Sequence, residues 1–175
     1  RGNISKILGE LMMLIENDKR GENYHLTLPY SKEEFYIPEN LYIIGMMNTA
    51  DRSLALIDYA LRRRFSFYTI MPAFKNQKFK DYINNINSKE LIDLISCIDN
   101  ELNENIRQDE SLGEGFLIGH SYFCNLDKFE DLHQKLFQII KYDIKPMLKE
   151  YWFDDKETAI NWVNRLNKII GEKDE

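Results

Sequence analysis

The chain is poor in cysteine, proline and long apolar runs, with only two cysteines and four prolines among its 175 residues. The longest apolar runs, residues 11–15 and 41–47, are far shorter than the roughly 20 residues that a membrane-spanning helix needs. Cys97 and Cys124 have neither CxxC spacing nor a nearby histidine pair, which argues against a zinc site and against a disulfide framework. The sequence therefore predicts a protein of the reducing cytoplasm, with no membrane contact and no metal site.

Positive charge is also in short supply, because 23 Lys and Arg residues stand against 29 Asp and Glu residues, a net charge of −6. A chain of this sign is not attracted to DNA as a whole, although local basic spots remain possible. Hydrophobic residues make up 43% of the chain and aromatic residues 13%, which excludes a disordered chain and allows a sizeable core.

A phosphate-binding loop is missing as well. None of the eight glycines is followed by lysine, so the chain contains no GxxxxGK[ST] motif. The chain also begins with Arg1-Gly2-Asn3, without a methionine, a signal peptide or a targeting motif. We therefore expect it to be a piece of a longer protein.

The part of the chain before Pro72 has the pattern of one half of an open α/β sheet. Apolar residues recur at helical spacing near the start, and a later run that is apolar on both faces is typical of a buried parallel strand. In chain order, we expect a helix over residues 4–20, a β-hairpin over 25–37, a buried strand over 41–47, a helix over 54–61 and a strand over 65–70.

After Pro72 the pattern becomes almost entirely helical. Pro146 is expected to kink or restart the second of three helices, and the glycine-punctuated segment 113–123 is expected to pack the helical lobe onto the α/β half. The sequence thus predicts two lobes, residues 1–72 and 73–175. The three apolar stripes are Leu91, Ile95, Ile98, Leu102 and Ile106, then Leu132, Leu136, Ile139 and Ile140, and finally Ala159, Trp162, Val163, Leu166 and Ile169.

Candidate chemistry lies just after the predicted buried strand, because ligands bind beyond the carboxyl ends of strands in open α/β sheets. Residues 48–52 offer an amide, a hydroxyl, a carboxylate and a guanidinium that can orient a water near a phosphate. Asp51 can equally serve as a simple helix cap. Arg62, Arg63 and Arg64 either complement a helix C-terminus or present a guanidinium to a neighbouring subunit's phosphate.

The segment LYIIGMMNTADRSLALIDYALRRRFSF, residues 41–67, closely resembles the McrB-type AAA+ GTPase subunits of modification-dependent (5-methylcytosine-specific) restriction systems. The string MNTADRS is the signature of that family, and YALRRRF follows it at the family's spacing. The segments RGNISKILGELMMLIENDKRGE, GEGFLIGHSYF and YWFDD resemble the family too, so the resemblance covers nearly the whole chain.

This resemblance implies an α/β fold, namely the C-terminal half of an AAA+ P-loop NTPase core followed by an α-helical lid. The hairpin at residues 25–37 corresponds to the insertion that precedes sensor 1, and the chain corresponds to the part that starts just after the Walker B motif. The resemblance also implies that the Walker A loop, the Walker B carboxylates and an N-terminal DNA-binding domain lie outside this chain.

The resemblance assigns roles to individual residues as well. Asn48 occupies the sensor 1 position, where its amide would help to place the attacking water. Arg63 and Arg64 match arginines that act across the subunit boundary. For His120, the residues by themselves favour a satisfied core histidine, and the resemblance adds a role near the nucleotide. The implied catalytic residues are Asn48, Thr49, Asp51, Arg63 and Arg64, and those implied near the nucleotide or the subunit boundary are Arg1, His120 and Ser121.

The parent protein implied by the resemblance is an enzyme that hydrolyses GTP or ATP with Mg²⁺. It would form a hexameric ring, drive DNA translocation for an McrC-like endonuclease subunit, and recognise methylated DNA through the N-terminal domain. One alternative is a MoxR-like AAA+ ATPase that remodels proteins, which should lack the MNTADRS string. Another is a nucleotide-free helical assembly module, which the missing phosphate loop favours.

We predict that this chain alone binds no nucleotide appreciably and is inactive, because the amides and the lysine that hold phosphates are missing from it. Calorimetric titration with GTP or ATP in the presence of Mg²⁺ tests this directly. Micromolar binding would contradict the prediction and would require a site built from the lid and the signature loop.

Overall fold

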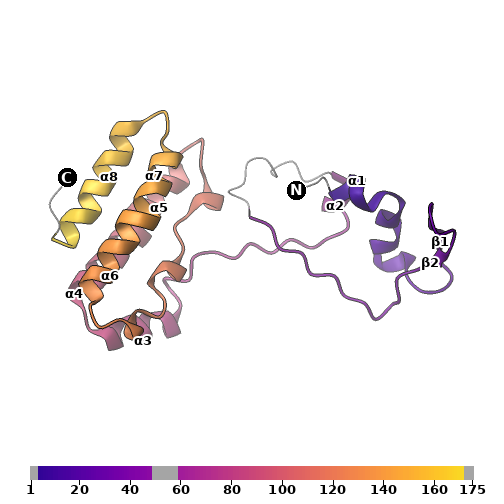
Figure 1. The fold of residues 1–175 in the computed structure, drawn as a ribbon, viewed down its shortest axis with the longest axis horizontal. Helices are drawn as coiled ribbons and strands as arrows, with labels where there is room; N and C mark the ends of the chain where they lie inside the picture. Colours follow the sequence, from indigo (N-terminus) through magenta and orange to yellow (C-terminus); the bar gives the residue numbers. More distant parts are fainter. Residues whose placement is uncertain (1–3, 49–58, 172–175) are drawn as a thin grey trace. The chain divides into compact units, whose positions relative to one another are not determined.

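The computed structural model describes residues 4–48 and 59–171, which fall into two compact units, residues 1–69 and 70–175 (Figure 1). Each unit has its own cluster of buried apolar side chains. None of the described helices is both long enough and apolar enough to cross a membrane.

Unit 1 begins with a short helix that tightens into 3-10 turns. The helix ends at Leu8 because Gly9 has a φ of +50°, in the left-handed region where a right-handed helix cannot continue. The prediction of one continuous helix over residues 4–20 is therefore wrong. The elements are α1 (Ile4–Leu8), η1 (Gly9–Ile15) and η2 (Asn17–Lys19).

The change of helix type also changes which residues form the core. Ile4 and Ile7, which belong to the apolar residues at helical spacing near the start of the chain, are 52% and 69% exposed. The buried cluster of unit 1 contains Leu14 instead, which the helical spacing had not selected. Half-buried Leu8, Leu11, Leu26, Leu61 and Phe65 pack against the four buried members, Met12, Leu14, Ile15 and Ile37.

The predicted hairpin is confirmed. Strands β1 (Leu26–Thr27) and β2 (Glu34–Phe35) pair antiparallel, with Leu26 opposite Phe35. The Leu28 amide continues the pairing by donating to the Glu33 carbonyl at 2.9 Å. The hairpin is joined to the preceding turn where the Gly21 amide donates to the Ile37 carbonyl at 2.9 Å.

The two longer predicted strands are wrong for this structure, because residues 41–47 and 65–70 form no strand. Ile44 and Met46 are 91% and 98% exposed, so the expected burial is also missing. A parallel strand exists only where neighbouring strands accept and donate its backbone hydrogen bonds. Within the described residues the one sheet is the β1–β2 pair, so neither segment has a strand to pair with.

The predicted helix over residues 54–61 lies mostly outside the described residues. Its described end is α2 (Tyr59–Arg62), which leads directly into Arg63 and Arg64.

The regular elements of unit 2 in its described part are all helices, and α8 packs against both α4 and α7 (Figure 1). Asn76, Ser88, Asp131 and Asp155 cap four of its helices by accepting backbone N–H groups. π-helical segments join α4 to α5 and α6 to α7, which makes two long helices. The elements are α3 (Gln77–Ile86), α4 (Lys89–Cys97), η4 (Ile98–Leu102), α5 (Asn103–Gln108), η5 (Glu114–Phe116), η6 (His120–Phe123), η7 (Leu126–Lys128), α6 (Leu132–Gln138), η8 (Ile139–Ile144), α7 (Lys145–Tyr151) and α8 (Lys156–Ile169).

The three predicted apolar stripes form the core of unit 2. Ile95, Leu132, Trp162 and Ile169 are half-buried against this core, and the other members are buried. Pro146 lies at the start of α7, directly after the π segment η8, where the helix restarts as expected.

The segment 113–123 packs inside unit 2, where a single buried amide holds it. Asn103, 2% exposed, donates from Nδ2 to the Ile118 carbonyl at 3.1 Å and accepts the Ile118 N–H at Oδ1 at 2.7 Å. Ile118 itself is 1% exposed, and the Phe116 ring meets the Tyr151 ring edge-on at 5.2 Å. The expected packing of this segment onto the α/β half stays a prediction.

We predict that Asn103→Ala lowers the free energy of unfolding of unit 2 by about 2–3 kcal/mol, because it leaves the buried N–H and C=O of Ile118 without partners. Urea unfolding followed by far-UV circular dichroism measures the change. Asn100→Ala is the matched control, because Asn100 is exposed and donates only to the exposed Ser96 hydroxyl. Equal effects of the two substitutions would contradict the prediction.

Candidate functional site

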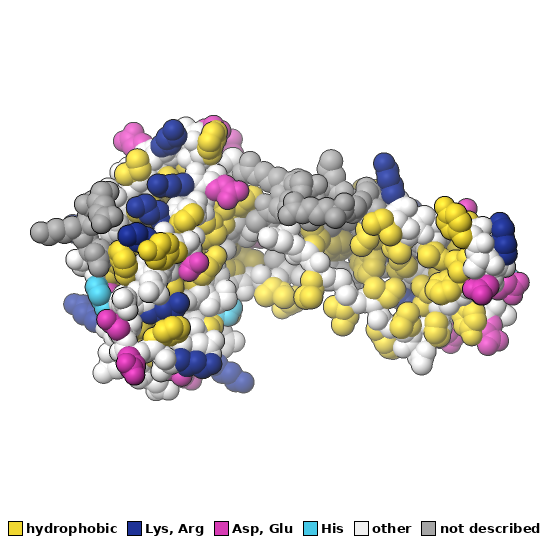
Figure 2. Space-filling model, in the orientation of Figure 1, with side chains coloured by type: hydrophobic (Ala, Val, Ile, Leu, Met, Phe, Trp, Pro, Cys, Tyr) yellow, Lys and Arg dark blue, Asp and Glu magenta, His cyan; other side chains and the backbone are white. Residues whose placement is uncertain are grey.

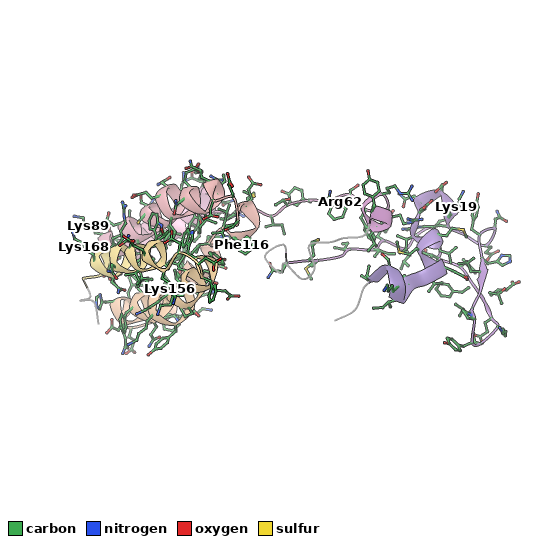
Figure 3. All side chains as sticks on the ribbon, turned by 90° about the horizontal axis from the view of Figure 1, so that it is seen from above. Lys19, Arg62, Lys89, Phe116, Lys156 and Lys168 are labelled. Carbon is green, nitrogen blue, oxygen red and sulfur yellow. The ribbon has the colours of Figure 1, made fainter. Side chains whose placement is uncertain are left out.

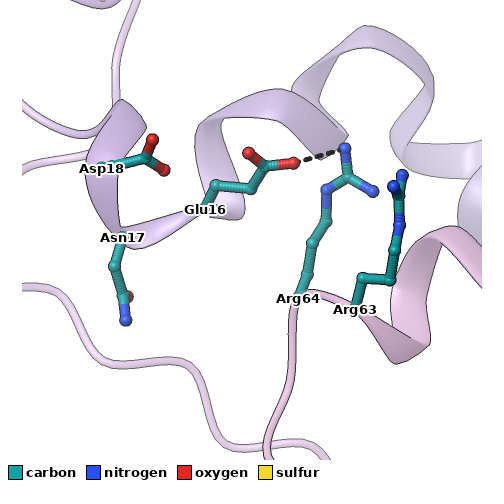
Figure 4. A pocket seen from close by; sticks show the side chains of 5 residues that line it. All are labelled: Glu16, Asn17, Asp18, Arg63 and Arg64. Atoms are coloured by element: carbon teal, nitrogen blue, oxygen red, sulfur yellow. Dashed lines mark ion pairs between the residues drawn. The ribbon is translucent and has the colours of Figure 1, made fainter.

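A surface pocket of about 340 Å³ lies in unit 1, where the end of α2 faces the junction of η1 and η2 (Figure 4). Arg63 and Arg64 line it from the α2 side, and Glu16, Asn17 and Asp18 line it from the other. The pocket therefore brings together two groups of residues that are far apart in the chain. Arg63 and Arg64 are the arginines for which the resemblance implies a role across the subunit boundary, and Glu16 and Asp18 are acidic.

Arg64 is held inside its own unit by an ion pair. Its Nη2 lies 2.6 Å from Oε1 of Glu16, and the Arg64 side chain is only 13% exposed. A charge-assisted hydrogen bond between partly buried side chains is stronger than one in open solvent, because less water screens the two charges. Arg64 is thus fixed at both its backbone, which donates to the Leu61 carbonyl at 3.0 Å, and its guanidinium.

The three arginines of the run have three different environments. Arg62, labelled in Figure 3, lies over the Phe67 ring with its guanidinium carbon 6.0 Å from the ring centroid. Arg63 is exposed, and in Figure 4 its side chain extends beside that of Arg64 while the ion pair reaches only Arg64. We call the Arg63–Arg64 pair at the end of α2 the corner. Of these two arginines, Arg63 is the more accessible to an anion from solvent.

The structure also places Asn48, which is exposed at the end of the extended segment 41–48. Asn48 is not among the residues that line the arginine pocket. Thr49, Asp51 and Arg1 lie outside the described residues, so their assigned roles stay predictions.

His120 has the surroundings of a structural histidine. Its ring meets the Phe79 and Phe74 rings edge-on at centroid distances of 5.4 and 6.2 Å. Its Nδ1 accepts the backbone N–H of Ala73 at 3.1 Å, so that nitrogen carries no proton in this arrangement. Ser121, its neighbour, is exposed. The assigned role of both residues near a nucleotide stays a prediction.

The two segments of unit 2 that resemble the family, GEGFLIGHSYF and YWFDD, contact each other. Tyr151 of YWFDD packs on Phe116 of GEGFLIGHSYF, and burial raises the pKa of Tyr151 to about 12. The Trp152 indole donates to Asp109 at 2.8 Å. Hydrogen bonds, first from the Ser111 hydroxyl and then from Trp152, keep the pKa of Asp109 below its usual value. In this unit these segments serve packing.

Glu16 is the residue of the site that the sequence did not single out. It follows the apolar run 11–15 and resembles any solvated acid near a helix end, so no spacing connects it to Arg64. The sequence also showed no sign of the contacts of Arg20. Its guanidinium donates to the Ile15 carbonyl at 3.0 Å and to the Leu41 carbonyl.

No group of three or more His, Cys, Asp or Glu side chains suited to a metal ion occurs among residues 4–48 and 59–171.

Comparisons with known proteins match both units. The AAA domain (dynein-related subfamily) matches residues 1–65, and the McrB alpha-helical lid domain matches residues 93–160. These matches confirm the expected order of a partial AAA core followed by a helical lid.

Two bacterial proteins are similar over most of the chain. The Type IV methyl-directed restriction enzyme EcoKMcrB subunit of Escherichia coli (strain K12) is 49% identical over 173 residues, with 95% of this chain and 38% of that protein covered. The Type II restriction enzyme BsuMI component YdiS of Bacillus subtilis (strain 168) is 24% identical over 165 residues, with 82% of this chain and 46% of that protein covered. The chain thus spans less than half the length of either relative.

We predict that the arginine-selective reagent phenylglyoxal modifies Arg63 several-fold faster than Arg64, because Arg63 is exposed while Arg64 is 13% exposed and paired. Tandem mass spectrometry of digested peptides locates the modified side chains. Arg107 is the control, because it is paired with Glu104 but 41% exposed, and it should react nearly as fast as Arg63. Equal rates at Arg63 and Arg64 in the folded chain would contradict the prediction.

Proposed function

Because this chain belongs to the McrB-type AAA subunits of methyl-directed restriction enzymes, of which it spans only part, we propose that it forms the second half of a nucleotide-hydrolysing motor module together with its lid. The observation that carries the proposal is the corner at the end of α2, where Arg63 is exposed beside the fixed Arg64. The exposed guanidinium of Arg63, next to the fixed Arg64, suits the oxygens of a neighbouring subunit's nucleotide.

Asn48 is proposed to act on the nucleotide that its own subunit holds. Its exposed amide can donate to and accept from a water, and so hold that water in line with the γ-phosphate. Thr49 and Asp51 would complete the same loop. Such positioning matters more in the transition state than in the ground state, so it raises turnover rather than affinity.

Arg63 and Arg64 are proposed to act across the subunit boundary, and Arg1 near the same boundary. A guanidinium that meets the charge developing on a transferred phosphoryl group contributes roughly 10³ to 10⁵ in rate. By the same family resemblance, the nucleotide would be bound together with Mg²⁺.

The wider assignment follows from the family. We propose that the whole protein hydrolyses GTP, or else ATP, in a hexameric ring. The ring would drive DNA translocation for an McrC-like endonuclease subunit, on methylated DNA bound through a separate domain. The free thiols of Cys97 and Cys124 suit a cytoplasmic location.

We predict that in the full-length protein Asn48→Ala and Arg63→Ala each reduce kcat by about 10²- to 10³-fold while nucleotide affinity changes little. Steady-state hydrolysis and equilibrium nucleotide binding measure the two effects. Arg62→Ala is the matched control, because the Arg62 guanidinium lies over Phe67 and should leave turnover near normal.

Mixing variants separates the two roles. An Arg63→Ala subunit mixed with a subunit defective only in Walker B should recover some turnover, because an intact composite site can form between them. An Asn48→Ala subunit mixed in the same way should recover none, because both defects lie on the nucleotide-holding subunit. Normal hydrolysis by assembled Arg63→Ala and Arg64→Ala rings would refute the proposed role of this corner and favour a simple assembly module.

A further inference from the structure

We propose that Glu16 is a positioning residue that holds Arg64 in place and thereby sets the position of the whole Arg63–Arg64 corner. The inference rests on the proposed function, because it assumes that this corner acts on a phosphate. It adds to that function a residue from a different element, whose carboxylate acts through Arg64 and touches no reacting atom.

The first observation is the contact itself. The Glu16 carboxylate lies 2.6 Å from the Arg64 guanidinium, and their side chains are 35% and 13% exposed. Charge and hydrogen bond act together at this distance, and the partial burial of Arg64 limits screening by solvent.

The second observation is that Glu16 projects from a fixed point. Its backbone N–H donates to the Met13 carbonyl at 3.2 Å, and its own carbonyl accepts the Lys19 N–H at 3.1 Å. The two residues before it, Leu14 and Ile15, are buried in the core of unit 1 at 0% and 6% exposure. The carboxylate therefore has a rigid base, as a residue that aligns another one requires.

The third observation concerns the arginine side of the pair. Leu61 and Phe65 pack against the same core on either side of the arginines. With the chain held before and after the corner, the Glu16 contact removes the remaining freedom of the long Arg64 side chain. Arg63 is the adjacent residue in the chain, so fixing Arg64 also limits the backbone from which Arg63 extends. A preorganised corner loses less entropy when it meets a phosphate.

Asp18 provides a matched control within the same pocket. It carries the same charge and lines the same pocket, but its carboxylate pairs with Lys19 at 3.2 Å. A general effect of negative charge near the arginines would involve Asp18 as much as Glu16, whereas a positioning role depends on the contact that Glu16 makes with Arg64.

The test uses the full-length protein in its assembled form with GTP and Mg²⁺. Glu16→Gln should lower kcat by about 10- to 100-fold, with KM within about twofold of the wild type, because misplacement of a catalytic group acts on the transition state. Asp18→Asn should lower kcat several-fold less than Glu16→Gln does, because the Asp18 carboxylate pairs with Lys19. Adding Glu16→Gln to Arg64→Ala should cause no further loss, because Glu16 acts through Arg64.

The melting temperature and the fraction of assembled rings are measured in parallel. A purely structural role of Glu16 would lower both quantities, and the loss of kcat in Glu16→Gln would add to the loss caused by Arg64→Ala. If Glu16→Gln does not assemble, Glu16→Asp keeps the charge on a shorter arm and should lower kcat with assembly intact. Normal kcat in whichever of these variants assembles, or additivity with Arg64→Ala, overturns the inference. If Arg63→Ala and Arg64→Ala themselves hydrolyse normally, the proposed function fails and the inference fails with it. If they are crippled while Glu16→Gln is normal, the inference alone fails.

Discussion

Every backbone N–H and C=O group needs a hydrogen-bond partner, and helices and strands meet this need in different ways. A helix supplies partners from its own neighbouring residues, whereas a strand depends on another strand. Unit 2 is made of helices, so its apolar stripes close into a core with Leu91, Leu136 and Leu166 all at 0% exposure. Residues 41–47 of unit 1 have the composition of a central strand, yet they lie extended and unpaired with any strand of the described chain.

This constraint also explains the surface of unit 1. Hydrophobic side chains gather on the face of unit 1 seen in Figure 2. Tyr42, Ile44 and Met46 are each more than four-fifths exposed. Apolar side chains on both faces of a run are typical of a strand that is buried in the interior of a sheet. The matched relatives are more than twice as long as the part of them that this chain covers, and the AAA match runs over residues 1–65.

In the lid, the same requirement is met by one polar side chain. The segment 113–123 contains two short 3-10 turns, η5 and η6, and the backbone N–H and C=O of Ile118, which lies between them, bond to a side chain instead. Asn103 supplies both a donor and an acceptor to Ile118 from the start of α5. Residues of GEGFLIGHSYF and YWFDD also pack within unit 2. Phe116 packs on Tyr151, and the Trp152 indole donates to Asp109. In the described unit, residues of these motifs contribute to the packing of the lid.

Much of the fold and part of the candidate site followed from the sequence alone. The apolar stripes of the helical lobe, the hairpin and the position of the arginine run at the end of a helix depend on local periodicity and turn chemistry, which are properties of neighbouring residues. Gly9 interrupts the first helix because its φ is in the left-handed region. The spacing of apolar residues does not reveal this backbone conformation. The pairing of Glu16 with Arg64, and the resulting difference between a fixed Arg64 and an exposed Arg63, came only from the tertiary structure. Three consecutive arginines have the same chemistry, so only contacts with residues distant in the chain can give each one a different role.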